Sequence, residues 1–200
     1  MDETKEFWED LYGDSPRWSG TVNAPLAERV GDLPPGRALD LGCGEGGDAL
    51  WLAERGWTVT AADLSTKALD RGRAEAARRG LVVDWREQDL SRELPDGSYD
   101  LVSAQFFQSP VELPREQVLR SAAAQVVPGG RLLVVGHAAG PPGSEHHDPA
   151  LLPGAQTVWD DLALGAEWEA LEVTDVSRTA TRPGGETVEL LDSVVHARRR

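Results

Sequence analysis

The sequence predicts an α/β protein in which helices cover both faces of a mostly parallel sheet. From residue 37 onward, short apolar and β-branched runs alternate with helical runs, and Gly- or Pro-rich turns separate them. The chain then closes with two β-rich runs, which only Arg182–Gly185 connect. Because a parallel connection needs about a dozen residues or more, this last pair must be antiparallel. We therefore expect one antiparallel strand near the edge of the sheet.

The N-terminal part precedes the sheet. Residues 4–12 place four apolar side chains on one face of a helix: Phe7, Trp8, Leu11 and Tyr12. A polar stretch follows, and a second, short helix begins near Asn23. We expect residues 1–33 to form a helical lid segment in front of a core at 37–200.

The core elements follow from local signals. The predicted strands are 37–41, 57–63, 81–87, 99–105 and 131–136, and the final hairpin pairs 168–180 with 186–197. The predicted helices are 48–55, the run from the N-cap Ser65 to Arg79 before the stop at Gly80, and 114–127 before the break Pro128-Gly129-Gly130. Right-handed crossovers bring the carboxyl ends of the parallel strands to one edge, where such sheets bind ligands.

Composition excludes several partners. The net charge of −14 argues against nucleic acid, because binding phosphates requires clustered Lys and Arg. No apolar run reaches the roughly 18 residues that span a bilayer. The acidic N-terminus lacks the features of a secretory signal, and the single Cys43 excludes an intrachain disulfide framework. We expect a cytoplasmic, single-domain protein over residues 1–200, a monomer or homodimer with no membrane partner.

A glycine-rich turn follows the first core strand. Glycines let the backbone turn sharply and approach a ligand closely. Gly42, Gly44 and Gly47 satisfy the GxGxxG spacing of dinucleotide sites. Asp40, however, is poorly placed beside a pyrophosphate, since like charges repel. A carboxylate at this position suits a cofactor that carries an ammonium and a sulfonium group.

At this point the sequence resembles the class I methyltransferases that depend on S-adenosylmethionine (SAM). Asp40, Gly42, Gly44 and Gly46 match the first motif of that family, acidic-x-Gly-x-Gly-x-Gly. The resemblance implies a Rossmann-like three-layer sandwich with a seven-stranded, mostly parallel sheet. The early segment also resembles, more loosely, small tellurite-resistance and thiopurine-type methyltransferases.

Further residues fall where that family binds SAM. Asp63 ends the second strand, where an acidic residue can accept from both ribose hydroxyls, as it would in an NAD site. The resemblance implies that Asp89 accepts from the adenine amino group and that the backbone of Leu90 donates to the ring. The complete set expected to contact the cofactor is Trp18, Asp40, Gly42, Gly44, Gly46, Asp63, Leu64, Asp89, Leu90 and Gln105.

Methyl transfer is an in-line displacement that needs no nucleophile or metal on the protein. A general base is needed if the acceptor is a hydroxyl or an ammonium. The candidate is His137, after the fifth predicted strand, where the substrate is expected and where an ordinary histidine pKa suits proton transfer; the alternative role of His137 is a structural hydrogen bond. The loop from His137 to Pro153 is long enough to act as a lid. Its His146, His147 and Asp148 lack a reliable ligand spacing, so we expect no metal.

The expected function is transfer of a methyl group from SAM to O, N or S of a small molecule. Three alternatives stay open from the sequence. One is an NAD-dependent oxidoreductase, which only the glycine spacing favours. Another is a SAM-binding protein without catalysis, which would carry the same cofactor residues. The third is a protein or peptide as methyl acceptor.

Overall fold

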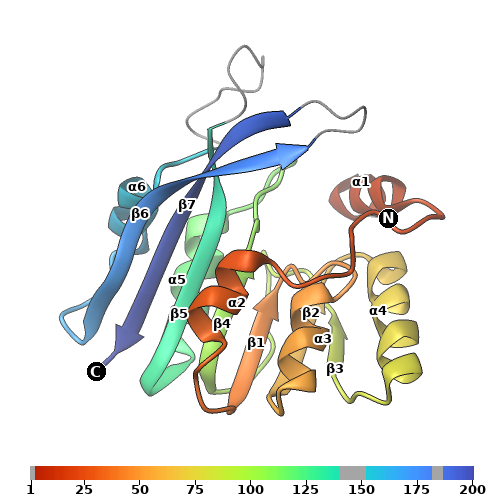
Figure 1. The fold of residues 1–200 in the computed structure, drawn as a ribbon, viewed down its shortest axis with the longest axis horizontal. Helices are drawn as coiled ribbons and strands as arrows, with labels where there is room; N and C mark the ends of the chain where they lie inside the picture. The colour runs from red at the N-terminus through yellow and green to blue at the C-terminus, as the bar shows by residue number, and fades with distance from the viewer. Residues whose placement is uncertain (1–2, 140–151, 182–186) are drawn as a thin grey trace.

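A computed structural model describes residues 3–139, 152–181 and 187–200. Within these ranges the strands form one seven-stranded sheet in the order β3-β2-β1-β4-β5-β7-β6 (Figure 1). The strands are β1 (Arg37–Leu41), β2 (Thr58–Asp63), β3 (Asp84–Glu87), β4 (Tyr99–Gln105), β5 (Val126–Ala139), β6 (Trp168–Thr181) and β7 (Thr187–Arg199). Strands β1 to β5 pair in parallel, and β7 pairs antiparallel with both β5 and β6. The predicted fold class and the antiparallel strand are confirmed.

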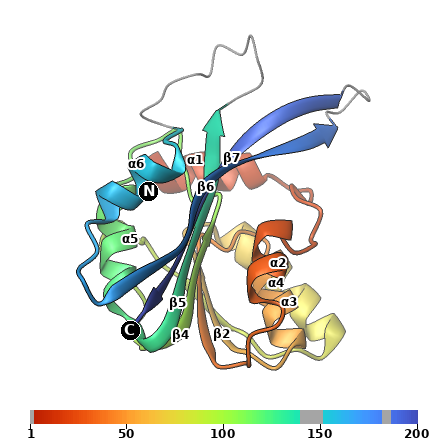
Figure 2. The same ribbon diagram turned by 60° about the vertical axis from the view of Figure 1, so that its left-hand side comes forward.

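Helices cover both faces of the sheet, which gives three layers (Figure 2). They are α1 (Glu3–Tyr12), α2 (Ala24–Val30), α3 (Gly47–Glu54), α4 (Thr66–Arg79), α5 (Arg115–Ala124) and α6 (Ala155–Leu162). Helices α5 and α6 lie on one face, and α2, α3 and α4 on the other. Along β5 the side chains of Leu132 and Val134 pack into the apolar core on the side of α5 and α6. Those of Leu133 and Val135 pack into the apolar core on the side of α2 and α3. This alternation explains why the strand reads as a continuous apolar run.

Most boundaries agree with the sequence to within three residues, but β5 is longer than predicted and one helix was not predicted. Strand β5 begins at Val126, before the Pro-Gly-Gly run that we expected to precede it, and ends at Ala139, so His137 lies within the strand and not after it. Gly129 adopts φ 87°, and the pairing with β4 shifts register near Tyr99, so the strand passes the break as an irregularity. Helix α6, outside every predicted element, packs Val158 and Leu162 into the core beside α5.

The sheet order reverses between β1 and β4, and each of these strands is followed by a helix on a different face. This switch point leaves a crevice at the carboxyl ends of the strands, the usual ligand position in open α/β sheets. Helix α1 lies above that edge (Figure 1). Across the described ranges, no helix has the length and apolar character needed to cross a membrane.

Candidate functional site

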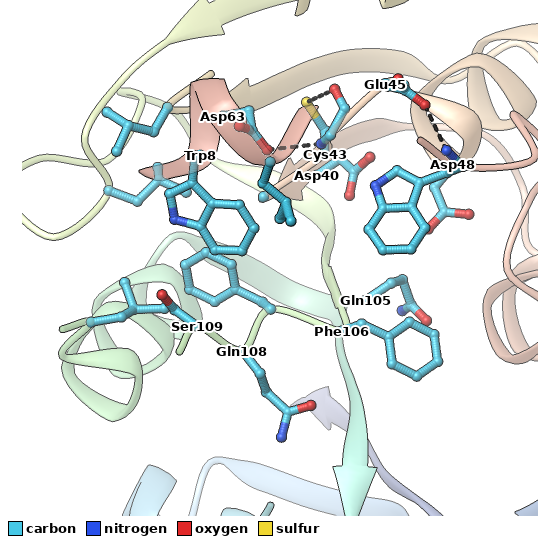
Figure 3. Close-up of a pocket in the computed structure, with 18 of the residues that line it drawn as sticks. Trp8, Asp40, Cys43, Glu45, Asp48, Asp63, Gln105, Phe106, Gln108 and Ser109 are labelled. Atoms are coloured by element: carbon cyan, nitrogen blue, oxygen red, sulfur yellow. Dashed lines mark hydrogen bonds between the residues drawn. The ribbon is translucent and has the colours of Figure 1, made fainter. Parts of the chain in front are cut away.

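A cavity of about 800 Å³ occupies the carboxyl edge of the sheet. Its walls come from α1, from the glycine turn after β1, and from the ends of β2 to β5. Figure 3 shows the acidic side chains Asp40, Asp48 and Asp63 along one side and Gln105 and Phe106 along the other. The sheet therefore gathers residues that are far apart in the sequence around one space.

Most of the residues singled out from the sequence lie on this wall. They are Trp18, Asp40, Gly42, Gly44, Asp63, Leu64, Asp89, Leu90, Gln105 and His137. Gly46 is not among the lining residues. It precedes α3 with φ 83°, and a Cβ at this position would collide with the ring of Trp85. The structure thus gives Gly46 a packing reason to be glycine, and a cofactor contact there stays a prediction.

The turn after β1 requires glycine at two of the positions that line the cavity, Gly42 and Gly44. Gly42 and Gly44 adopt φ 66° and 53°, in the left-handed region that side chains disfavour. A Cβ on Gly42 would lie 2.6 Å from the ring of Phe107, and one on Gly44 would lie 2.7 Å from the Tyr12 hydroxyl. The bare backbone of this turn is therefore held close to the cavity.

Three buried carboxylates surround the turn. Asp40 is 2% exposed, and its Oδ2 has no hydrogen-bond partner within the described part of the chain. Burial, and then the charges of Asp48 and Asp63, raise the pKa of Asp40 well above its ordinary value. Burial also raises the pKa of Asp48, although Asn23 donates to it through its backbone N–H at 2.7 Å and its side chain at 2.8 Å. A cluster of buried carboxylates destabilises the fold when no positive charge pairs with it, and it therefore favours the binding of a cation.

Asp63 is held in place by backbone groups. Its Oδ2 accepts from the N–H of Gly44 at 2.8 Å, and its Oδ1 accepts from the N–H of Ser65 at 2.9 Å. Burial raises its pKa, against these hydrogen bonds. Each carboxylate oxygen can still accept another hydrogen bond, so the group is fixed in orientation and remains available on the cavity side.

The segment after β3 is arranged by Asp89. Its Oδ1 accepts from the backbone N–H and the hydroxyl of Ser91, at 3.0 and 2.5 Å, and its Oδ2 pairs with Arg92 at 3.0 Å. Leu90 is 8% exposed and packs into the core beside α5. Asp89 therefore organises this turn as well as lining the cavity.

Helix α1 and the segment after it are fastened over the cavity by Glu45. This side chain accepts from the backbone N–H groups of Arg17, at 3.0 and 3.1 Å, and Trp18, at 2.9 Å. It also accepts from Arg71 at 2.7 Å, and Arg71 donates further to the carbonyl oxygens of Tyr12 and Gly13. Burial opposes ionisation, but these donors hold the pKa of Glu45 below its ordinary value. We refer to Glu45 and Arg71 as the latch.

A second contact ties α1 to α4. The carboxylate of Glu9 accepts from the backbone N–H groups of Thr66 and Lys67, at 2.7 and 3.3 Å, and from the hydroxyl of Ser65 at 3.2 Å. A negative side chain at a helix N-terminus is stabilising there. Ser65 also caps α4, as predicted, by accepting from Ala68. The N-terminus of α4 thus holds α1 in place over the cavity.

The other end of the cavity is formed by β4, β5 and the final hairpin. Phe106 follows β4 with φ 55°, and its ring centroid lies 4.6 Å from that of His137. His137 lies within β5, directly opposite Asp192 on β7, and the two side chains interact at 3.0 Å between Nδ1 and Oδ1. Arg178 on β6 lines the cavity and pairs with the second oxygen of Asp192.

Sequence reasoning missed the latch and the hairpin residues. Arg71 reads as part of a solvated helix face, and nothing local distinguishes Asp192 or Arg178 within β-rich runs. Asp192 can be identified as the partner of His137 once the pairing of β5 with β7 is known, because residues directly opposite on antiparallel strands have adjacent side chains.

The sequence also drew attention to Cys43 and to three residues of the long loop, His146, His147 and Asp148. Cys43 lines the cavity, and burial raises the pKa of its thiol, which disfavours the thiolate form. His146, His147 and Asp148 lie outside the described residues. Within those residues, no group of three or more His, Cys, Asp and Glu side chains is arranged to hold a metal ion.

Comparisons with known proteins agree with this geometry. The family model of the methyltransferase domain matches residues 38–130, which hold the glycine turn, Asp63 and Asp89. The 2-heptyl-1-hydroxyquinolin-4(1H)-one methyltransferase of Mycobacteroides abscessus is 37% identical over 148 residues, which cover 69% of this chain and 64% of that protein. Residues 38–130 thus match the methyltransferase-domain family, as the resemblance to the class I SAM-dependent methyltransferases predicts. This match supports SAM as the cofactor.

Another relative is named for a different kind of acceptor. Ribosomal RNA small subunit methyltransferase C of Chromohalobacter salexigens is 36% identical over 117 residues, 56% of this chain and 35% of that protein. The chain thus spans 35% and 64% of the length of these two curated relatives. The crystal structure of TehB from Haemophilus influenzae superposes on 96% of this chain and 67% of that chain, with a TM-score of 0.71. At 17% identity, this likeness shows the fold alone.

Proposed function

We propose that this chain binds SAM in the cavity and transfers its methyl group to a small-molecule acceptor. The observation that carries the proposal is Asp40, whose buried Oδ2 is without a hydrogen-bond partner in the described ranges and faces the cavity beside two further carboxylates. A cationic ligand compensates such a cluster, and a pyrophosphate makes its repulsion worse. The same cluster therefore speaks against an NAD-dependent oxidoreductase.

The residues present fit SAM in three places. The Gly42–Gly44 turn and Asp40 would receive its amino-acid part, with the ammonium group near the carboxylates. Asp63, fixed by two backbone donors, would accept from the ribose hydroxyls. Asp89 and Leu90 would hold the adenine. Gln105 is 8% exposed, and its Oε1 lacks a hydrogen-bond partner among the described residues, which leaves one more buried acceptor on the wall.

When bound, SAM supplies a methyl group attached to a cationic sulfur, ready for attack by a nucleophile. The chain contributes position and environment. The latch and α1 lie over one side of the cavity, and the carboxylates lie on the cofactor side. Holding two reactants in near-attack geometry contributes roughly 7–11 kcal/mol in favourable cases. No covalent intermediate on the protein is required.

A small acceptor fits the surroundings of the cavity. The cavity of about 800 Å³ lies within the usual size range of small-molecule pockets, and the net charge of −14 disfavours RNA. The M. abscessus relative, named for a hydroxyquinolone, is covered over more of its length than the ribosomal RNA methyltransferase.

A methyl-transfer assay tests the proposal. The protein is incubated with methyl-labelled SAM and a library of small hydroxyl, amine and thiol compounds, with an RNA and a peptide mixture alongside. We expect label in a small compound and stoichiometric S-adenosylhomocysteine (SAH). Label only in RNA or peptide would contradict the acceptor class. Tight SAM binding with no transfer to any acceptor would favour a binding protein.

A further inference from the structure

The final hairpin places a buried carboxylate behind a cavity histidine. His137 and Asp192 are directly opposite in the pairing of β5 with β7, and Nδ1 lies 3.0 Å from Oδ1. Asp192 is 2% exposed and is not part of the cavity wall, whereas His137 lines the cavity with 41% of its side chain exposed. The carboxylate therefore acts on the ring of the histidine and does not reach a ligand.

His137 is fixed at both its backbone and its ring. The side chain of Gln108 accepts from the N–H of His137 at 2.6 Å and donates to its carbonyl oxygen at 3.0 Å. Phe106 contacts the ring from another side, at 4.6 Å between centroids. A side chain held in this way keeps its orientation when a ligand arrives, which is what a catalytic group requires.

Asp192 is the acceptor that sets the tautomer of His137. Burial opposes the charge of Asp192, but hydrogen bonds from His137 and Arg178 hold its pKa below the ordinary value. A carboxylate accepts only, so Nδ1 of His137 carries the proton and Nε2 of the neutral ring is left as a base. The exposed part of the ring gives the captured proton a route to water.

An aromatic ring forms the wall beside this base. Phe106 holds a positive φ of 55°, which non-glycine residues adopt at a cost, and its N–H donates to Val135 at 2.7 Å. The guanidinium of Arg178 lies 5.7 Å from the centre of the Phe106 ring. Elsewhere, the lining of the cavity includes the apolar side chains Trp8, Leu11, Phe107 and Leu113. Such walls favour a planar, apolar ring.

We propose that His137 is the general base and Asp192 its positioning residue for an acceptor with a hydroxyl group on a planar apolar ring. This inference rests on the proposed function. The hydroxyl O–H bond breaks, and its proton goes to Nε2 of His137. The oxygen forms a bond to the methyl carbon while the carbon–sulfur bond breaks, and that electron pair stays on sulfur in SAH. His137 then releases the proton to solvent.

The chemistry selects a hydroxyl. A phenol-like group with an ordinary pKa of about 10 is protonated at neutral pH and is a poor nucleophile until its proton is removed. An amine attached directly to such a ring is neutral at pH 7 and already has a lone pair, and a thiol with a pKa of about 8.5 is partly ionised without help. A base oriented by its own carboxylate is needed most for the hydroxyl.

Binding of a matched pair of probes tests the inference without turnover. Protein loaded with SAH is titrated with 1-naphthol and with naphthalene. We expect 1-naphthol to bind about tenfold more tightly, since its hydroxyl donates to Nε2. His137→Gln and Asp192→Asn should each remove most of that preference. His196→Gln, a buried histidine on β7 outside the cavity lining, is the control and should keep it. Equal binding of the two probes, or no binding of 1-naphthol, overturns the proposal.

A spectroscopic measurement separates positioning from a merely structural role. In ¹⁵N NMR of the SAH-loaded protein, His137 should show the Nδ1-protonated tautomer, and Asp192→Asn should abolish that preference while circular dichroism stays unchanged. Should Asp192→Asn not fold, the spectrum of the wild type decides, since an Nε2-protonated tautomer contradicts the proposal. SAH binding by the wild type is measured first, because its absence refutes the proposed function itself.

Discussion

The two ends of the cavity are built in different ways. At the cofactor end, Asp40 and Asp63 come from the neighbouring strands β1 and β2, and the glycine turn directly follows β1. At the acceptor end, Phe106 follows β4, whereas His137 and Asp192 lie on β5 and β7, so the three residues are distant in sequence. One end depends on a local motif, and the other depends on how the final hairpin pairs with β5.

This difference determines what a substitution at each end should disturb. The cofactor end presents carboxylates and bare backbone to a cation, so changes there should alter SAM affinity. The acceptor end presents a base against an aromatic wall, so changes there should alter the acceptor and leave SAM alone. A substitution at one end that alters the property assigned to the other end would contradict this division.

The largest effect is expected for Asp63→Ala. The substitution removes the acceptor for the ribose and also leaves the N–H groups of Gly44 and Ser65 without this partner. Hydrogen bonds to a charged group contribute about 1.5–3 kcal/mol, so SAM affinity should fall about 100-fold by calorimetry. His137→Gln, the matched variant at the other end, should keep wild-type affinity. Equal losses in both variants would contradict the division.

The next largest effect concerns Asp40→Asn. SAM carries a charge at sulfur that SAH lacks, and a buried carboxylate favours the charged form. We expect the preference for SAM over SAH to decrease about tenfold, and the affinity for SAH to decrease less than that for SAM, because both ligands carry the ammonium group and only SAM carries the sulfonium. An unchanged ratio of the two dissociation constants would mean that Asp40 does not interact with the positive charge on the sulfur of SAM.

A smaller change is expected for Glu45→Gln. The amide retains the shape of the latch but loses the ionic bond to Arg71, so α1 should open more often. Stopped-flow measurement should show SAM dissociating about fivefold faster, as the loss of about 1 kcal/mol implies. Glu75→Gln on the exposed surface of α4 is the control, because Glu75 pairs only with helix-surface arginines in the described structure. Equal rates in both variants would contradict a latch.

The smallest effect is on stability without ligand. Asp40 has an ordinary pKa of 3.8, which burial raises in the folded protein. Between these two pKa values the folded protein retains a proton that the unfolded chain has lost, so stability falls as pH rises through this window. Asp40→Asn should abolish that loss and raise the melting temperature at pH 7 by roughly 2–4 °C, for about 1 kcal/mol. A lower melting temperature would show that the charge stabilises the fold.

The same contrast explains how much could be predicted. Strands β1 and β4, the Ser65 cap and the terminal antiparallel pair follow from local patterns, and so do the cavity positions of Asp40 and Asp63. The partnership of His137 with Asp192 depends on the register of β5 against β7, which no short pattern specifies. Helix α6 was missed because AQTVWDDL is short and has no side-chain cap.

The most direct test of the account is calorimetric titration of the purified protein with SAM, SAH and NAD in parallel. We predict micromolar binding of SAM and SAH, with SAM the tighter of the two at neutral pH, and no heat from NAD. Binding of NAD without SAM would contradict the central claim, since the buried carboxylates would then tolerate a pyrophosphate.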